Sequence, residues 1–385
     1  MTSRETKKHT KHTALIKPLG GEYHRNEWAI LGAPCDIIHK LTAEINEQIG
    51  SAFKIGYLDA AHKAPSKESE YHSSYTDKID YQSFVTLTKP DQKQSRKYFN
   101  DLDILLVNGN HFIGDKQIVI INEDKKESLS KKLDRLTDIK MILLKRSSDD
   151  IHKYLMPLIE GRKDLEIFRL DQVSKIANAM IKEMVASTPP LNGLVLAGGK
   201  SQRMGRDKGA LEYYNKPHRE YLADILNKSV NQVFISCRKN QDELIESRYK
   251  KVYDTFDGLG PYGAILSAFR EQPNHAWFTI ACDLPHLDKK TMKQLVASRN
   301  PSKLATCFHN PETKFPEPLI TIWEPRAYPV LLEFLSQGYS CPRKVLINTD
   351  IEEIEMKDPI HMLNANDPDT YEEAKKTISK TLVSN

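Results

Sequence analysis

The sequence predicts an α/β protein with two domains, each built around a sheet that carries helices. The chain has 385 residues, which is enough for two domains of ordinary size. Two consecutive prolines, Pro189 and Pro190, follow a helix-like segment and precede an apolar run that reads as a strand. We therefore expect one domain over residues 1–187 and a second over residues 188–385.

The second domain shows apolar runs that alternate with helical patterns. The expected strands cover residues 193–197, 232–236 and 276–281, and the expected helices cover residues 220–229, 263–270 and 289–298. Such alternation predicts a mostly parallel sheet with helices on both faces, and ligands of these sheets bind at the carboxyl ends of the strands.

The first domain is expected to be a smaller α/β unit. An apolar run beginning at Glu27 could enter a phosphate-binding loop before a helix over residues 41–50, but the Gly-Lys-Ser/Thr ending of such loops is missing. Further strand-like runs cover residues 54–62, 102–111 and 117–122. The polar stretch 64–99 is expected to be an insertion or a mobile loop. His62 and His111 end two of the runs and are candidate site residues, although a strand-end histidine is more often simply hydrogen-bonded.

The composition narrows the function classes. The formal charge of +4 comes from 56 basic and 52 acidic residues, a small surplus that does not require a nucleic-acid partner. The five cysteines contain no Cys-x-x-Cys pair, which argues against a zinc site and against a disulfide framework. No run approaches the roughly 20 apolar residues of a membrane span. We therefore expect a soluble, cytoplasmic protein without nucleic-acid or membrane partners.

The most informative segment is the glycine-rich, basic loop that follows the first strand of the second domain. Gly198 and Gly199 let the backbone approach an anion closely, and Arg203, Arg206 and Lys208 add positive charge nearby. This combination predicts a site for a nucleoside triphosphate, although two glycines after a strand would by themselves indicate only a turn. The residues expected to contact the nucleotide here are Leu196, Ala197, Gly198, Gly199 and Lys208.

A carboxylate follows another strand of the same domain. The apolar run 276–281 leads to Asp283, which stands two residues before Pro285. A carboxylate at a strand end beside a triphosphate suits Mg²⁺, which would bridge phosphate oxygens. Asp283 is therefore the expected metal ligand, although an isolated aspartate in this position could equally cap a helix or begin a turn.

Two further features could serve a second substrate. The glycine-rich stretch 258–263 opens a helix, and helix N-termini attract phosphates. It could hold a phosphorylated acceptor or serve only as a helix entrance. Arg343 and Lys344 are adjacent cations that could grip a phosphate, with solvated surface charges as the alternative.

These motifs together resemble one enzyme family. The string Leu-Ala-Gly-Gly-x-Ser-x-Arg-Met-Gly-x-Asp-Lys over residues 196–208 is similar to the signature of nucleotidyltransferases, and most closely to that of the MobA-like molybdenum cofactor guanylyltransferases. Further motifs of that family are similar to Cys-Asp-x-Pro at residues 282–285, Pro-x-Pro-Leu at residues 316–319 and Asn-x-Asn at residues 364–366. The resemblance covers residues 191–378 and implies a Rossmann-like nucleotidyltransferase domain.

The resemblance implies transfer of GMP from GTP to the phosphate of molybdopterin carrying molybdenum, with release of pyrophosphate, in molybdenum cofactor biosynthesis. It implies Mg²⁺ on Asp283 and catalytic roles for Lys208, Asp283 and Arg203. It adds Ser236 and Asp254 as nucleotide contacts, although this chain is one residue shorter near Ser236 and the alignment there stays open. The acceptor contacts implied by the resemblance are Gly260, Pro261, Gly263, Asn364 and Asn366, and Arg343 and Lys344 are added as acceptor contacts because of their adjacent charges.

Other functions remain open on the sequence alone. Cytidylyl transfer to the same acceptor and nucleotidyl transfer to a sugar phosphate would use the same loop, although residues 315–320 and 342–346 favour a molybdopterin acceptor over a sugar. A non-catalytic carrier of the finished dinucleotide is the third alternative. Lys208 and Asp283 count against it, because a carrier needs neither a metal ligand nor charge stabilisation at phosphorus.

The order of elements in the first domain resembles that of the MobB-like GTP-binding protein that accompanies the guanylyltransferase, in a degenerate P-loop form. Because the loop lacks its lysine ending, we expect this domain to dock a partner rather than to hydrolyse GTP. The expected partners are a molybdenum-insertion protein, a client molybdoenzyme or a second subunit.

Overall fold

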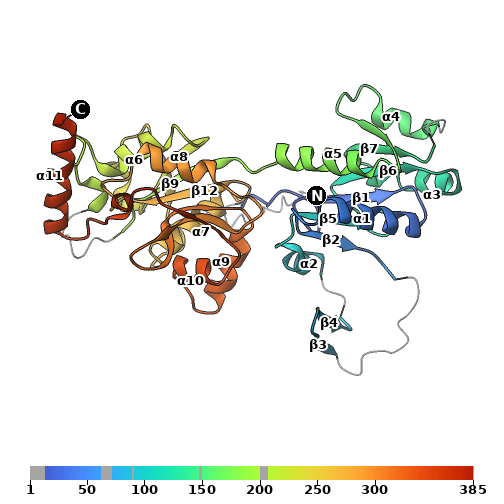
Figure 1. Ribbon diagram of the computed structural model, residues 1–385, viewed down its shortest axis with the longest axis horizontal. Coiled ribbons are helices and arrows are strands. Elements are labelled where there is room, and N and C mark those ends of the chain that lie inside the picture. Colours follow the sequence, from blue (N-terminus) through green and yellow to red (C-terminus); the bar gives the residue numbers. More distant parts are fainter. Residues whose placement is uncertain (1–13, 62–71, 89–90, 147–149, 200–206, 385) are drawn as a thin grey trace, which may run out of the picture. The chain divides into compact units, whose positions relative to one another are not determined.

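The computed structural model describes residues 14–61, 72–88, 91–146, 150–199 and 207–384, which form two compact units (Figure 1). The first unit is Leu19–Thr188, and the second begins at Pro189, one residue after the boundary expected from the sequence. Residues 14–18 group with the second unit, where the Lys17 carbonyl accepts a hydrogen bond from Asn274 Nδ2 at 3.3 Å. The domain expected over residues 1–187 therefore does not include them.

The first unit is built on a six-stranded sheet of order β2-β5-β1-β6-β7-β8, in which every pairing is parallel. Its strands are β1 (Glu27–Leu31), β2 (Ile55–Leu58), β5 (Ile104–Asn108), β6 (Lys116–Ile121), β7 (Ile139–Leu144) and β8 (Glu166–Arg169). Helices α1 (Cys35–Ile49) and α5 (Val173–Ala186) pack on one face of the sheet, and α3 (Lys126–Ser130) and α4 (Met156–Ile159) pack on the other. This confirms the expected α/β class of the first unit.

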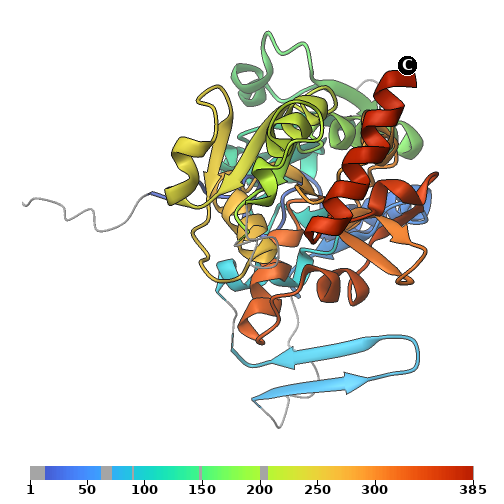
Figure 2. The ribbon, with the colours of Figure 1, turned by 90° about the vertical axis from the view of Figure 1, so that its left-hand side faces the viewer.

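The polar stretch 64–99 is not a plain loop. It contains an antiparallel hairpin, β3 (Ser73–Asp77) and β4 (Gln82–Thr86), and the helix α2 (Gln92–Phe99). The hairpin forms a separate two-stranded sheet, and Figure 2 shows its two antiparallel arrows. Its strands contain Tyr75, Thr76, Phe84, Val85 and Thr86, residue types that are enriched in strands.

The second unit carries a seven-stranded sheet of order β11-β10-β9-β12-β14-β13-β15. All pairings are parallel except those of β14, which runs antiparallel to both β12 and β13. The strands are β9 (Leu191–Leu196), β10 (Gln232–Cys237), β11 (Lys250–Tyr253), β12 (Ala276–Ala281), β13 (Ala305–Asn310), β14 (Phe315–Trp323) and β15 (Glu352–Glu355). The sequence therefore predicted the mostly parallel sheet correctly.

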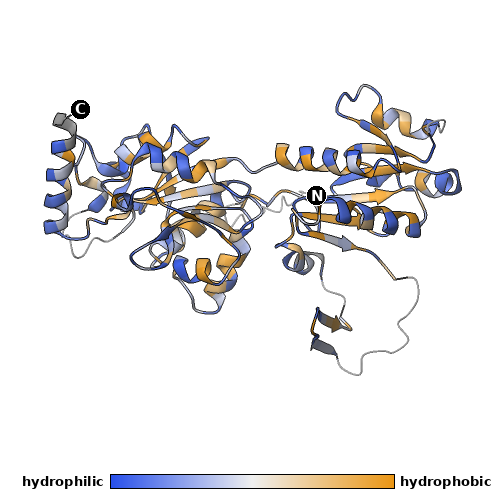
Figure 3. Cartoon of the chain, viewed as in Figure 1, coloured by the Kyte–Doolittle hydropathy of each residue, from blue (hydrophilic) through white to orange (hydrophobic). Residues whose placement is uncertain are grey.

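Helices cover both faces of this sheet, as expected (Figure 1). One face packs against α6 (His218–Leu226) and α8 (Lys289–Ala297), and the other packs against α7 (Pro261–Glu271), α9 (Ala327–Ser336) and α10 (Pro342–Ile347). The final helix α11 (Pro368–Ser384) packs through Ala374 and Ile378 on Leu211 and Tyr213. In Figure 3 the central strands are hydrophobic, whereas α11 shows a largely hydrophilic surface.

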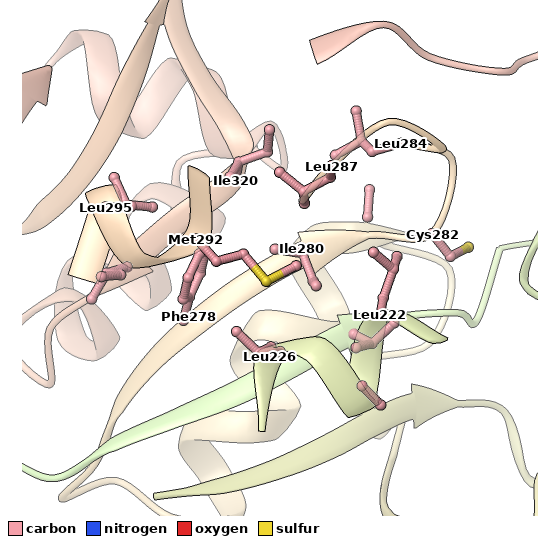
Figure 4. Close-up of a cluster of buried hydrophobic side chains, with 14 of the residues drawn as sticks. Leu222, Leu226, Phe278, Ile280, Cys282, Leu284, Leu287, Met292, Leu295 and Ile320 are labelled. Atoms are coloured by element: carbon pink, nitrogen blue, oxygen red, sulfur yellow. The ribbon is translucent and has the colours of Figure 1, made fainter. Parts of the chain in front are cut away.

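The core beside the sheet consists of buried, closely packed apolar side chains. Figure 4 shows side chains of α6, β12 and α8 interdigitating, and several of them have no exposed surface, among them Leu222, Leu226, Phe278, Ile280, Met292 and Leu295. Full burial of one such side chain stabilises the fold by roughly 1.5–3 kcal/mol. The carboxyl ends of the parallel strands are thus held rigidly at one edge of the sheet.

No helix in the described ranges is long and apolar enough to span a bilayer.

Candidate functional site

A cavity of about 500 Å³ lies at this edge, where β9 and β12 end and α7 begins. Its wall consists of Leu196, Ala197, Gly198, Gly199, Asp207, Lys208, Asp254, Gly260, Pro261, Ala264, Ala281, Cys282, Asp283, Leu319 and Asn366. These residues come from distant parts of the second unit. They meet because parallel neighbouring strands present their carboxyl ends at the same edge.

Lys208 and Asp283 form an ion pair in the wall of the cavity. Lys208 begins the 3-10 turn η4 (Lys208–Ala210), and its Nζ is 3.4 Å from Asp283 Oδ2. The same Nζ donates a hydrogen bond to Asn366 Oδ1 at 2.6 Å. Both charged side chains are only 19% exposed, so their charges act through a lower effective dielectric than at an open surface. The structure therefore joins a cation, a carboxylate and an amide that are far apart in the sequence.

Asp283 has one oxygen that suits a metal ion. Its Oδ1 is buried and has no hydrogen-bond partner among the described residues, a costly state for a carboxylate oxygen. The described residues offer no group of three His, Cys, Asp or Glu side chains that could hold a metal ion. A metal here would therefore take a single protein carboxylate, and Mg²⁺ is commonly held by one or two carboxylates together with substrate phosphates.

Asp254 forms a second acidic point of the cavity, just after β11. Burial raises the pKa of its carboxyl, and the hydrogen bond from Ser236 opposes that shift. Ser236 Oγ donates to Asp254 Oδ1 at 3.1 Å. A Cβ at Gly198 would lie 2.8 Å from Asp254 Oδ2, so a larger residue there would require the Asp254 carboxylate to shift. Ser236 itself is completely buried behind Asp254 and is not in the cavity wall.

The loop before α7 supplies another part of the cavity wall. Gly260 has φ +57°, a left-handed conformation that favours glycine, and Pro261 begins the helix. Both residues line the cavity. Gly263 does not line the cavity. A Cβ there would lie 2.3 Å from the Phe256 carbonyl oxygen, so the glycine allows close packing against that carbonyl group.

Asp207 is a cavity residue that the sequence interpretation did not single out. Its Oδ1 accepts a hydrogen bond from Gly209 N at 3.0 Å, and its Oδ2 accepts one from Arg219 Nη1 at 3.0 Å. The signal for Asp207 was present, since it stands directly before Lys208 in the motif. Arg219 lies on α6 and carried no local signal.

Besides Gly263, three sequence-predicted acceptor residues lie away from the cavity wall. Arg343, on α10, has its Nη2 3.9 Å from Glu317 Oε2, and Lys344 Nζ lies 5.0 Å from the centre of the Tyr339 ring. Asn364 is exposed and does not line the cavity, unlike Asn366. The last candidate of the motif, Arg203, lies outside the described residues.

The first unit places one candidate histidine in a polar cluster. His111 Nε2 lies 3.4 Å from Cys35 Sγ at the start of α1 and 4.0 Å from Asp59 Oδ1. Burial raises the pKa of the Cys35 thiol, but hydrogen bonds from Asn108, His111 and Asn110 outweigh burial and hold that pKa below its ordinary value. His62 lies outside the described residues.

Comparison with known proteins concerns the second unit. Residues 193–352 match the family model of the MobA-like NTP transferase domain. The chain is 35% identical over 186 residues to the molybdenum cofactor biosynthesis bifunctional protein of Synechocystis, covering 48% of this chain and 54% of that protein. It is 27% identical over 194 residues to the molybdenum cofactor guanylyltransferase of Pseudomonas putida, covering 49% of this chain and 100% of that protein.

A solved structure also aligns with the chain, that of molybdopterin-guanine dinucleotide biosynthesis protein A from Archaeoglobus fulgidus. The alignment has 23% identity and a TM-score of 0.43, and it covers 49% of this chain and 99% of that one. The chain thus spans about half the length of the Synechocystis relative, and each of these alignments involves about half of this chain.

Proposed function

We propose that the chain, whose residues 193–352 match the family model of the MobA-like NTP transferase domain, transfers GMP from GTP to the phosphate of molybdopterin carrying molybdenum, releasing pyrophosphate. One observation carries the proposal: Lys208 Nζ and Asp283 Oδ2 lie 3.4 Å apart in the wall of a single cavity. A cation beside a carboxylate with an unpaired oxygen suits a triphosphate and its metal ion. The name of the Pseudomonas putida relative, a guanylyltransferase, supports the choice of guanine.

The nucleotide would lie along the glycine loop. Backbone N–H groups near Gly198 and Gly199 would approach the phosphates. No atom of the non-neighbouring described residues lies within 4 Å of a Cβ built at Gly199, which leaves room for a ligand on that side. Asp254 would accept a hydrogen bond from a hydroxyl of the nucleotide. In this arrangement Ser236 does not contact the nucleotide but orients Asp254.

Asp283 would hold Mg²⁺ through its oxygens, of which Oδ1 has no partner among the described residues. A metal ion held by Asp283 would supply electrostatic stabilisation of the negative charge that develops around the α-phosphorus. Lys208 contributes a fixed positive charge on the same side, held in place by Asn366.

The reaction needs no protein nucleophile. A phosphate oxygen of the acceptor forms a bond to the α-phosphorus in line, and the bond from that phosphorus to the oxygen of the leaving pyrophosphate breaks. The protein positions the two anions and stabilises the charge of the transition state. Lys208 and the loop amides supply that stabilisation, and Arg203 remains a candidate to join them.

The acceptor phosphate would bind on the other side of the cavity. Gly260 and Pro261 form its wall at the N-terminus of α7, where backbone N–H groups and the helix dipole favour an anion. Asn366 lines the same cavity as a neutral group and accepts a hydrogen bond from Lys208. Arg343, Lys344 and Asn364 would need to move to reach an acceptor bound here.

Pyrophosphate release with purified full-length chain tests the proposal. We expect release with GTP, Mg²⁺ and molybdopterin, and little release with CTP or with a sugar phosphate as acceptor. Release with CTP alone would identify a cytidylyltransferase. Binding of the finished dinucleotide without release from any triphosphate would identify a carrier and overturn the enzymatic proposal.

The first unit is proposed to dock a molybdenum-insertion protein or a client molybdoenzyme in the cytoplasm, where the five free cysteines of the whole chain would stay reduced. Calorimetric titration of the full chain with GTP tests the docking role. One GTP per chain supports it, whereas a second, Mg²⁺-dependent site that persists in Lys208→Ala would overturn it.

A further inference from the structure

A buried side chain connects the two described ends of the glycine loop. Gln241, on the 3-10 helix η5 (Lys239–Leu244), donates from Nε2 to the Ala197 carbonyl at 3.3 Å and to Asp207 Oδ2 at 3.4 Å. Its Oε1 accepts from Arg238 N at 3.0 Å, which fixes the orientation of the amide. Gln241 is only 5% exposed, so these bonds do not compete with bulk water.

Arg219 holds Asp207 from the side of α6. Its Nη1 donates to Asp207 Oδ2 at 3.0 Å, and its Nη2 donates to the Leu244 carbonyl. The residue is 3% exposed, so its charge depends on Asp207 for compensation. The planar guanidinium serves two acceptors at once, which the single ammonium of lysine would not reproduce in the same geometry.

These contacts reach Lys208 through one short turn. Asp207 Oδ1 accepts from Gly209 N at 3.0 Å and thereby caps the turn that contains Lys208. A Cβ at Gly209 would lie 3.2 Å from Arg219 Cδ, so the turn rests on the aliphatic stem of the arginine. A displacement of Arg219 would therefore affect both the Asp207 cap and the side chain on which the turn packs.

We propose that Arg219 and Gln241 are positioning residues that fix Asp207 against Ala197 and so hold Lys208 at Asp283. Neither Arg219 nor Gln241 lines the cavity, so both act through Asp207 rather than on a ligand. The catalytic consequence rests on the proposed function, whereas the placement of Lys208 can be measured without it.

Arg219→Lys tests the proposal, because it keeps the charge and loses the double contact. Since a displacement of about 1 Å can cost about a hundredfold in rate, we expect kcat to fall between about 10-fold and 100-fold, with KM changed by less than about 3-fold. Gln241→Met, which keeps the shape and removes the amide, should cost less than Arg219→Lys. An unchanged kcat in Arg219→Lys would overturn the proposal.

Arg299→Lys is the matched control. Arg299 is also a partly buried arginine of the second unit, paired with Glu324 through Nε at 2.7 Å and Nη2 at 2.8 Å and bonded to the Pro189 carbonyl at 2.8 Å. The two variants should lose comparable thermal stability, and only Arg219→Lys should lose kcat. Equal losses of kcat in both variants would show a merely structural effect.

A double-mutant cycle tests whether Arg219 acts through Lys208. In a Lys208→Ala background, we expect Arg219→Lys to cost less than about 3-fold more, because residues that act as a unit are not additive. The full loss repeated in that background would overturn the proposal.

Crystal structures give a readout that does not need activity. In Arg219→Lys we expect the separation of Lys208 Nζ and Asp283 Oδ2 to grow from 3.4 Å to more than the about 4 Å of an ion pair. If the native chain releases no pyrophosphate, the proposed function fails while this distance still decides the positioning role. A distance that stays at 3.4 Å in the variant would overturn the positioning role.

Discussion

Replacing Lys208 by alanine would remove the cationic side chain among the described residues of the cavity wall, together with its contacts to Asp283 and Asn366. Lys208 Nζ lies 3.4 Å from Asp283 Oδ2, and a phosphate oxygen bound in the same cavity would approach it to a similar distance. At an effective dielectric near 20, two unit charges at this distance interact by about 5 kcal/mol, and in bulk water by about 1 kcal/mol. Loss of one preorganised donor in a comparable site costs about 3 kcal/mol, which lies between these limits.

A loss of about 3 kcal/mol corresponds to about a hundredfold fall in kcat. The assay is pyrophosphate release at saturating GTP and molybdopterin, with GTP affinity measured separately by calorimetry. Lys303→Ala serves as the control. Lys303 Nζ lies 2.6 Å from Asp350 Oδ1, and neither residue lines the cavity. We expect this control to stay within about 2-fold of the native rate, as for a surface ion pair. A Lys208→Ala rate within about 3-fold of the native rate would refute the reasoning.

Three further predictions follow from the same structure. Asp283→Asn should lower the rate by at least about a hundredfold and weaken its dependence on Mg²⁺ concentration; unchanged Mg²⁺ dependence would show that Asp283 is no ligand. Because burial raises the folded-state pKa of Asp254, the folded chain binds more protons there than the unfolded chain and loses stability as pH rises through that pKa. Asp254→Asn should therefore raise the urea midpoint at pH 7, with a smaller gain near pH 4, and a lower midpoint at pH 7 would contradict this. Hydrogen bonds outweigh burial at Cys35 and hold the pKa of its thiol below the ordinary value. Iodoacetamide should therefore alkylate Cys35 at lower pH than the exposed Cys341, as measured by peptide mass spectrometry. His111→Gln should reduce this difference in pH between the two cysteines.

The strands were predictable where burial is complete. The run 276–281 is observed unchanged as β12, because all six residues are apolar or buried and a strand packed on both faces needs no alternation. The direction of β14 was not predictable, since Phe315–Trp323 reads as the same kind of run whether its neighbours are parallel or antiparallel. Strand direction depends on long-range pairing rather than on local pattern.

The site was predictable in its centre and not in its surroundings. Lys208 follows β9 and Asp283 follows β12, and these two strands are parallel neighbours in the sheet. The two side chains meet because the carboxyl ends of neighbouring parallel strands lie at the same edge. Arg219 and Gln241 were missed because their contacts depend on how α6 and η5 are rotated, which no local motif records. Arg343 was assigned by charge alone, and its guanidinium points toward Glu317 instead of the cavity.

A crystal structure of the full chain with a non-hydrolysable GTP analogue and Mn²⁺ tests the central claim most directly. We predict an anomalous Mn²⁺ peak within about 2.2 Å of an Asp283 carboxylate oxygen, the usual length of such a bond. The triphosphate should lie between Gly198 and Lys208 in the same cavity. A triphosphate bound elsewhere, with Asp283 Oδ1 still without a ligand, would contradict the account.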